Sequence, residues 1–180
     1  MKRKKGWFIR FLFLCISLIL SIILTSGQSE EISSVPDLLL DLEQVRINFI
    51  YDGDTVRTDT GVKIRLLGVD APEMNWEERE PNFFAREAFE YTKENLLGQL
   101  VYLEYDEVKE DKYGRTLAYL FLADGTFFNQ KLLEEGYARL LLIPPNLKYS
   151  DVLREAEERA RAAGRGIWSA VVEEIFEYVQ

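Results

Sequence analysis

The stretch DGDTV, which begins at Asp52, places two aspartates on either side of a glycine between two strand-like runs. Asp52 and Gly53 alone are the commonest signal for a hairpin turn. Asp54 adds a second carboxylate beside the first, and the two charges repel unless a cation or an arginine offsets them. An EF-hand calcium loop does not fit, because Val56 falls at its third ligand position and Arg57 at its required glycine. The stretch is therefore either a polar turn or half of a metal site.

A second set of charged residues lies in RLLGVDAPE, residues 65–73. Asp70 and Glu73, three positions apart, are typical of a capping box at the start of a helix. Alternatively, Arg65, Asp70 and Glu73 lie along one strand and the turn after it, which brings one cation and two anions to the same end of a sheet. Asp54 and Asp70 would then form a hard oxygen site suited to Ca²⁺, completed by a backbone carbonyl and waters.

The third element is EDKYGR, residues 110–115, in which Gly114 permits a tight turn and Arg115 opens the next strand. Taken alone, it is typical of a solvated charged hairpin. Together, the three elements offer a metal site, a carboxylate that can orient or deprotonate water, and two guanidiniums that can grip phosphate oxygens. This set is suited to phosphodiester hydrolysis, because metal and arginines offset the charge that develops on the phosphoryl oxygens.

The composition limits the chemistry further. The 180 residues include no histidine, which excludes Ser-His-Asp triads, paired-histidine ribonuclease chemistry, His-metal nuclease motifs and HExxH zinc sites. The single cysteine, Cys15, lies in an apolar N-terminal run, so the remainder of the chain forms no disulfide. The net charge is −9, and loss of the five basic residues in segment 1–27 would leave 17 Lys and Arg against 31 Asp and Glu, a charge of −14.

Residues 1–27 are typical of an export signal. Lys and Arg at positions 2–5 precede an uncharged apolar run at residues 11–25, and small residues follow it. The run is shorter than the roughly 20 residues of a membrane-spanning helix, so we favour a cleaved signal, with an uncleaved membrane anchor through residues 7–25 as the alternative. Both interpretations predict an exported protein, either secreted or held at the cell surface. Residues 28–43 are expected to be a linker.

The elements that must position these residues follow from apolar periodicity. Strands are expected at residues 45–50, 55–58, 62–69, 100–105 and 115–122. Helices are expected from Ala85 to Leu96, ending near Gly98, and at residues 128–135 and 150–163, the last with Ser150 as its N-cap. Tyr119 and Phe121 are expected to pack in the interior. The pattern predicts an α+β fold, an OB-type five-stranded β-barrel with three helices, because closure removes exposed sheet edges.

Four motifs in order, DGDTV, IRLLGVDAPE, DKYGRTLAY and GRGIWS, resemble the staphylococcal nuclease (thermonuclease) family over residues 44–169, with residues 170–180 as a C-terminal tail. The resemblance implies an OB-type barrel with three helices and a Ca²⁺-dependent endonuclease that hydrolyses DNA and RNA. It also implies attack at the 5′ P–O bond, which leaves 3′-phosphates.

The resemblance also implies a role for each matching residue. Asp54 and Asp70 match calcium-ligating aspartates, and Ala71 falls where a main-chain carbonyl completes the metal site. Arg65 and Arg115 match phosphate-binding arginines, and Glu73 matches the general base. Two further residues match the surroundings of the site: Tyr113 lies where a tyrosine contacts the terminal phosphate, and Asp52 belongs to the same acidic loop. Lys112 is expected to help hold the substrate.

The sequence departs from the family pattern in three places. Residues 140–146, LLLIPPN, replace two tyrosines that stack on bases, and Ala71 replaces a threonine. The loop at residues 74–82 is acidic and lacks the family's lysines, although Trp76 offers a new stacking surface. We expect a monomer that binds DNA and RNA weakly and non-specifically, because phosphate binding normally uses many Lys and Arg. Two alternatives remain: a non-catalytic nucleic-acid or protein-binding module, and a surface protein that binds calcium without hydrolysis.

Overall fold

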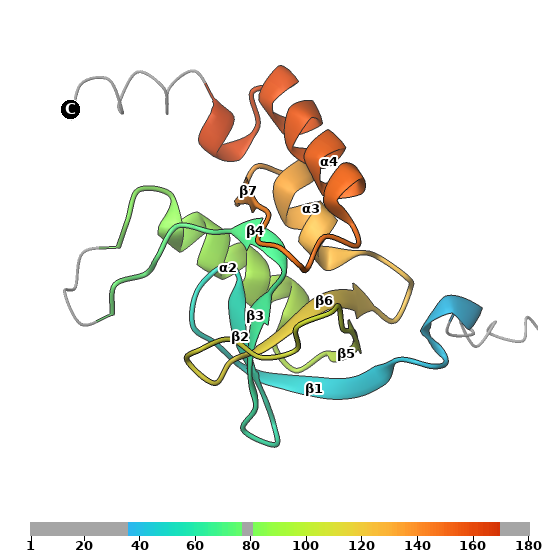
Figure 1. The fold of residues 1–180 in the computed structure, drawn as a ribbon. Coiled ribbons are helices and arrows are strands. Elements are labelled where there is room, and N and C mark those ends of the chain that lie inside the picture. The colour runs from blue at the N-terminus through green and yellow to red at the C-terminus, as the bar shows by residue number, and fades with distance from the viewer. Residues whose placement is uncertain (1–35, 77–80, 170–180) are drawn as a thin grey trace, which may run out of the picture. The chain divides into compact units, whose positions relative to one another are not determined.

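Five strands close into a barrel in the order β1, β2, β3, β6, β5 (Figure 1). The computed structural model describes residues 36–76 and 81–169. The barrel strands are β1 (Glu43–Ile50), β2 (Thr55–Thr58), β3 (Lys63–Leu66), β5 (Leu100–Glu104) and β6 (Thr116–Leu122). All neighbouring pairs are antiparallel except β3 with β6, and β1 pairs with β5 to close the barrel. The predicted α+β fold with an OB-type barrel is confirmed.

The barrel interior is filled by apolar side chains from all five strands. Ile47, Val56 and Ile64 are fully buried, whereas Asn48 and Phe49 on β1 are exposed. Strand β6 is buried along most of its length, because helix α3 covers the face that points away from the barrel. Tyr119 and Phe121 are buried, so the expectation that they pack in the interior is confirmed.

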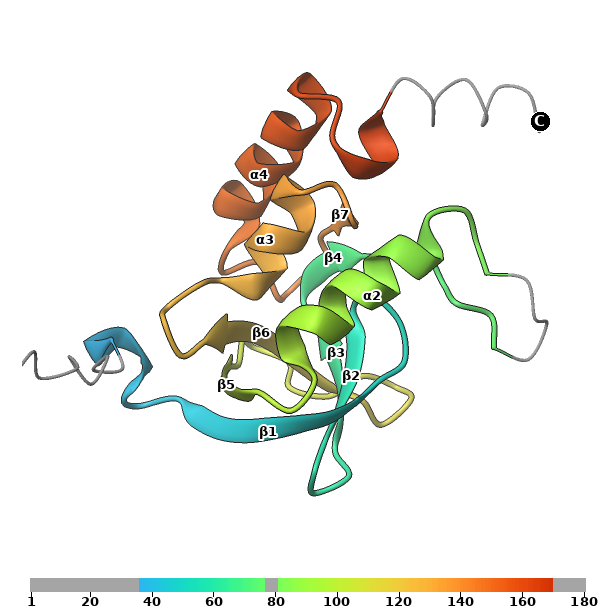
Figure 2. The ribbon, with the colours of Figure 1, turned by 180° about the vertical axis from the view of Figure 1, so that it is seen from behind.

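The three predicted α-helices are present: α2 (Ala85–Leu96), α3 (Phe128–Glu134) and α4 (Ser150–Ala162). Helices α2 and α3 pack on the barrel strands, and α4 packs on α3 and β7 (Arg139–Leu141). Helix α2 buries residues at helical spacing, among them Ala88, Thr92 and Leu96. Helices α3 and α4 lie side by side, on the side of the barrel away from β1 (Figures 1 and 2). Two short 3₁₀ turns, η1 (Asp37–Leu39) and η2 (Gly166–Trp168), flank the domain. Tyr149, not Ser150, is the N-cap of α4.

One predicted strand is wrong in its extent. Residues 62–69 were expected to form a single strand, but β3 ends at Leu66 and a separate strand, β4 (Gly68–Asp70), follows. The N–H of Leu67 still bonds to β6, at the carbonyl of Ala118, before the chain leaves the barrel. Strand β4 then pairs with β7 (Arg139–Leu141), which the sequence did not predict. The change of partner turns the end of this segment toward α3 and α4.

The segment before the barrel is packed from Leu39 onward. Leu39 is fully buried in the core and β1 begins at Glu43, so the last part of the expected linker, residues 28–43, belongs to the fold. The signal or anchor at residues 1–27 and the tail at residues 170–180 lie outside the described residues. Within residues 36–76 and 81–169, the structure has no helix with the length and apolar character needed to span a membrane.

The GRGIWS motif attaches the end of the domain to α3 by direct backbone contact. The N–H of Ile167 donates to the carbonyl of Gly136, 2.9 Å away, and Ile167 is buried. A Cβ on Gly166 would lie 2.2 Å from the Gly136 carbonyl oxygen, which is a backbone atom that cannot rotate away. The motif therefore depends on close approach between two glycines.

We predict that Gly166→Ala destabilises the protein far more than Gly164→Ala. Both glycines have positive φ, +53° and +60°, so both substitutions cost roughly 1–2 kcal/mol of backbone strain. Only Gly166 adds the backbone clash, since the nearest atom to a Cβ on Gly164 is 3.7 Å away. We expect Gly166→Ala to lose at least about 2 kcal/mol more in urea denaturation. Equal losses would show that the contact is not a constraint.

Candidate active site

The bend between β1 and β2 carries Asp52 and Asp54 into the protein. A Cβ on Gly53 would lie 2.6 Å from the Cβ of Ala71 and 2.9 Å from that of Ala88, and the φ of Gly53 is outside the left-handed region. The predicted turn between two strands is confirmed, because residues 51–54 join antiparallel β1 and β2. Close packing rather than a positive φ requires a glycine at position 53. The hydroxyl of Thr92 donates to the Gly53 carbonyl at 2.7 Å and fixes the bend to α2.

Asp54 is a buried carboxylate with a full set of donors. Its side chain is 1% exposed. One oxygen accepts the N–H of Ala71 at 2.6 Å, and the other accepts the hydroxyl of Thr55 at 2.9 Å. Burial raises the pKa of Asp54 to about 8, Arg65 opposes this rise, and the charge of Asp52 adds to it. The main cause is the removal of the carboxyl from water, which Arg65 offsets only in part.

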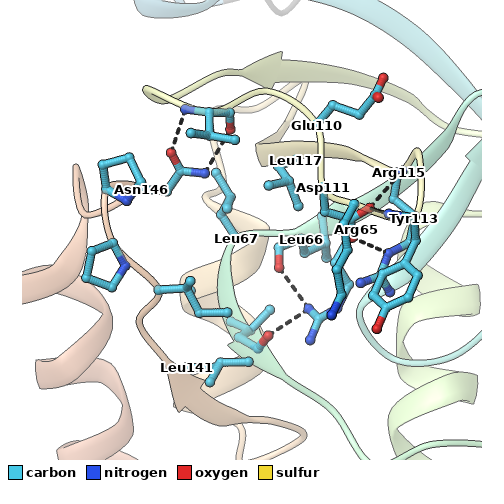
Figure 3. Close-up of a pocket in the computed structure, with 17 residues that line it drawn as sticks. Arg65, Leu66, Leu67, Glu110, Asp111, Tyr113, Arg115, Leu117, Leu141 and Asn146 are labelled. Atoms are coloured by element: carbon cyan, nitrogen blue, oxygen red, sulfur yellow. Dashed lines mark hydrogen bonds and ion pairs between the residues drawn. The ribbon is translucent and has the colours of Figure 1, made fainter.

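Arg65 joins the three segments that form this part of the site. One terminal nitrogen donates to the carbonyls of Leu66 and Val69, at 2.9 and 2.7 Å. The other lies 3.1 Å from Asp54 and 3.0 Å from Asp70, and the arginine side chain is 11% exposed. Figure 3 shows the guanidinium turned toward the two carbonyls at the edge of a pocket. The structure thus brings Asp54, Arg65 and Asp70 together, as their spacing predicted.

Glu73 lies in the irregular segment that follows β4, beside the same carboxylates. Partial burial raises its pKa, and the neighbouring Asp52 raises it further. No helix begins at Asp70, because residues 71–75 are irregular and α2 starts only at Ala85, so the capping-box alternative is wrong.

Arg115 reaches the site from the other side, held by Asp111. One oxygen of Asp111 accepts the N–H groups of Tyr113 and Arg115, at 2.9 and 3.0 Å, and the other accepts Nε of Arg115 at 2.6 Å. Although burial works against it, these hydrogen bonds from Arg115 and Tyr113 hold the pKa of Asp111 below its usual range. Asp111 is not among the site residues predicted from the sequence. Its position three residues before Gly114 is an Asx-turn signal that would have identified it.

Tyr113 and Lys112 lie at the mouth of the site. Tyr113 is 71% exposed, and the guanidinium of Arg115 and the ammonium of Lys112 lie 5.4 and 5.0 Å from its ring centre. Both residues are therefore accessible to a ligand that contacts Arg115.

A pocket of about 570 Å³ separates Arg65 and Arg115 from an apolar wall (Figure 3). The wall is formed by the stretch predicted to lack stacking tyrosines, and its lining side chains are Leu141, Ile143, Pro144 and Pro145. Asn146 fixes this stretch by exchanging two 2.8 Å hydrogen bonds with the backbone of Val108. The pocket therefore has a cationic end and an apolar end.

The donor chemistry fits a hard cation. Among residues 36–76 and 81–169, no three acidic side chains are grouped closely enough to form a metal cluster by themselves. A site here would use the carboxylates of Asp54 and Asp70 with main-chain and water oxygens, which is a ligand set typical of Ca²⁺. The N–H of Ala71 donates to Asp54, which places this residue beside the carboxylate. A cation bound here would offset the cost of burying the Asp54 carboxylate.

A family model described as staphylococcal nuclease homologue matches residues 63–170, more than half of the chain. The chain belongs to the staphylococcal nuclease family. It is 40% identical over 123 residues to a thermonuclease of Staphylococcus hyicus, which covers 67% of this chain and 72% of that protein. It is 40% identical over 129 residues to a thermonuclease of Staphylococcus intermedius, a match that covers 70% of this chain and 76% of that protein. It is 35% identical over 137 residues to the endonuclease YncB of Bacillus subtilis, a match that covers 71% of this chain and 63% of that protein.

We predict that Asp54→Asn stabilises this staphylococcal nuclease homologue when calcium is absent. Because the folded-state pKa, about 8, exceeds the ordinary value of 3.8, the carboxyl favours folding below about pH 4, and this stability is lost as the pH rises through about 8. A neutral amide avoids the loss. At pH 7 in chelator we expect a gain of about 1–3 kcal/mol in denaturant unfolding, and little difference near pH 4.

The control is Asp59→Asn, which removes the same charge from an exposed turn. A loss of stability at pH 7 in Asp54→Asn, or an equal gain in Asp59→Asn, would contradict the prediction.

Proposed function

We propose that the chain is a calcium-dependent phosphodiesterase that hydrolyses DNA, RNA or both. Its family membership and its thermonuclease and endonuclease relatives support a nuclease. The observation that carries the proposal is that Arg65 and Arg115 line one pocket beside the carboxylates of Asp54, Asp70 and Glu73. Two guanidiniums next to an acidic cation site are suited to a phosphate diester and to few other substrates.

The two arginines bind and orient the scissile phosphate. Asp111 holds Nε of Arg115, and the Leu66 and Val69 carbonyls hold one nitrogen of Arg65, so both guanidiniums are positioned before substrate arrives. This preorganisation matters because donors that need no rearrangement stabilise the developing phosphoryl charge most effectively. Tyr113 and Lys112 lie at the same end of the pocket and contact the terminal phosphate.

Glu73 acts as the general base. It lies in a segment without regular structure beside Asp52. Its raised pKa makes the carboxylate a stronger base near neutral pH. The carboxylate takes a proton from water as the water oxygen bonds to phosphorus. The 5′ P–O bond breaks, the leaving 5′-oxygen takes a proton from solvent water, and the products are a 3′-phosphate and a 5′-hydroxyl.

Asp54, Asp70 and the main-chain carbonyl of Ala71 would hold the calcium ion, with Asp52 supporting the loop. When bound, Ca²⁺ supplies positive charge that polarises a phosphoryl oxygen. The burial of Asp54 keeps its carboxylate away from competing water, and the N–H of Ala71 orients it. The cost of burying this charge is acceptable because a cation compensates for it.

The acidic surface predicts weak attraction for substrate. With a net charge of −9, the chain lacks the extended basic surface that most nucleic-acid-binding proteins use. We therefore propose a monomeric enzyme with weak, non-specific binding and a shallow salt dependence. The basic and apolar residues of segment 1–27 support export from the cytoplasm, with cleavage or anchoring of this segment as alternatives.

The test is cleavage of single-stranded DNA, RNA and duplex DNA in Ca²⁺ and in chelator. We expect cleavage only in Ca²⁺. Glu73→Gln should lower kcat by roughly 10²–10⁴-fold through loss of the base, and Arg115→Ala by roughly 10²–10³-fold through loss of charge stabilisation.

Matched controls are Glu87→Gln and Arg154→Ala, which change exposed residues of the same types on α2 and α4. They should cleave at the wild-type rate. If the wild type binds nucleic acid but cleaves nothing in Ca²⁺, the chain is a binding module. If Glu73→Gln and Arg115→Ala cleave at the wild-type rate, the assignment of the site is wrong.

A further inference from the structure

The outer face of β1, β2 and β3 carries an aromatic–basic patch, defined here as Phe49, Tyr51, Arg57, Lys63 and Trp76. Phe49 pairs in register with Arg57, and Arg57 with Lys63, so these three side chains lie side by side across the three strands. Asn48 also contacts the patch, since its Oδ1 accepts a hydrogen bond from Nε of Arg57 at 3.5 Å. In an acidic protein, this grouping of two cations with three aromatic rings is a departure from the average surface. It therefore calls for a functional explanation.

The cations of the patch are held by rings rather than by carboxylates. The ammonium of Lys63 lies 4.1 Å from the ring centre of Tyr51, and the guanidinium carbon of Arg57 lies 4.9 Å from that of Phe49. Neither forms an ion pair with any acidic side chain in residues 36–76 and 81–169. Their charges remain available to an anion, while the rings fix where they lie.

Trp76 adds an exposed ring that is nevertheless fixed in place. Its indole N–H donates to the carbonyl of Tyr51 at 2.7 Å, and its ring meets that of Phe89 edge to face at 5.5 Å. These two contacts leave the residue 59% exposed, and Phe49 is 42% exposed. An anchored, exposed aromatic ring is a ready surface for stacking.

The patch is continuous with the active site. Lys63 and Arg65 are two residues apart on β3 and so point to the same side of the strand. Tyr51 directly precedes Asp52, and Trp76 follows Glu73 by three positions. Because β3 pairs with β2 on one side and β6 on the other, the patch and the pocket flank Arg65 from opposite sides.

We propose that the aromatic–basic patch binds the single-stranded segment of substrate that extends beyond the scissile phosphate on the side away from the pocket. Arg57 and Lys63 bind its phosphates, and Trp76 and Phe49 stack on its bases. Stacking on protein rings requires bases that are free of a duplex, so the patch makes the enzyme selective for single strands. This inference rests on the proposed function for the position of the scissile phosphate.

The test measures binding without cleavage, using the full-length chain with Glu73→Gln in Ca²⁺. The probe is a fluorescein-labelled oligothymidylate of about twelve nucleotides, compared with a duplex of the same length. Trp76→Ala is expected to raise Kd for the single strand by about tenfold. Arg57→Ala with Lys63→Ala should also weaken binding and reduce the slope of log Kd against log salt by about 1.4. Binding of the duplex should change less in both cases.

Arg154→Ala, a distant exposed arginine, should change neither Kd nor slope. Quenching of tryptophan fluorescence by the single strand should disappear in Trp76→Phe, a readout that a purely structural role would not affect. Unchanged Kd, slope and quenching in the patch variants would overturn the inference. Binding and cleavage are measured separately, so the two hypotheses can fail independently. If the wild type cleaves but the patch variants bind as well as the parent protein, only the role of the patch is refuted. If the patch variants weaken binding but the wild type cleaves nothing, only the proposed function is refuted.

Discussion

The ion pair between Arg65 and the buried carboxylate of Asp54 is the contact on which the rest of the site depends. Arg65 comes from β3, Asp54 from the bend after β1, and Asp70 from the end of β4, so one guanidinium joins three segments. It also donates to the carbonyls that lead into β4. Burial nevertheless raises the pKa of Asp54, because the charged form loses its hydration inside the protein, and a bound cation would offset this cost. Such tolerated cost is typical of functional sites.

The surrounding fold keeps this arrangement in place through buried polar contacts. Thr92 on α2 bonds to the Gly53 carbonyl, and Asn129 on α3 links the carbonyl of Leu67 to the N–H of Leu120. The second contact ties the segment between β3 and β4 to β6, at the point where the chain leaves the barrel. Asp111 holds the Arg115 side chain in a similar way, because its carboxylate accepts a hydrogen bond from Nε of Arg115. Because each contact is fully or partly buried, it holds a defined geometry rather than adding large net stability.

The sequence predicted the barrel strands, the helices and the residues that meet at the site, because periodicity and motif order are local signals. It did not predict β4 and β7, since strands of three residues carry no periodic pattern and form only when the chain changes partner. Gly53 was correctly predicted to lie in a turn, but the packing that requires a glycine there comes from Ala71 and from Ala88 on a distant helix. Thr92 lies on the apolar face of its helix, where a polar residue indicates a buried hydrogen bond. The sequence does not reveal its partner, the carbonyl of Gly53, because the two residues are 39 positions apart.

A crystal structure of the Glu73→Gln protein with Ca²⁺ and a short single-stranded oligonucleotide would test this arrangement of the site most directly. We expect an anomalous calcium peak about 2.3–2.6 Å from oxygens of Asp54, Asp70 and Ala71. We also expect a phosphate in contact with both Arg65 and Arg115. A metal bound elsewhere, or a phosphate backbone that avoids the two arginines, would contradict this arrangement.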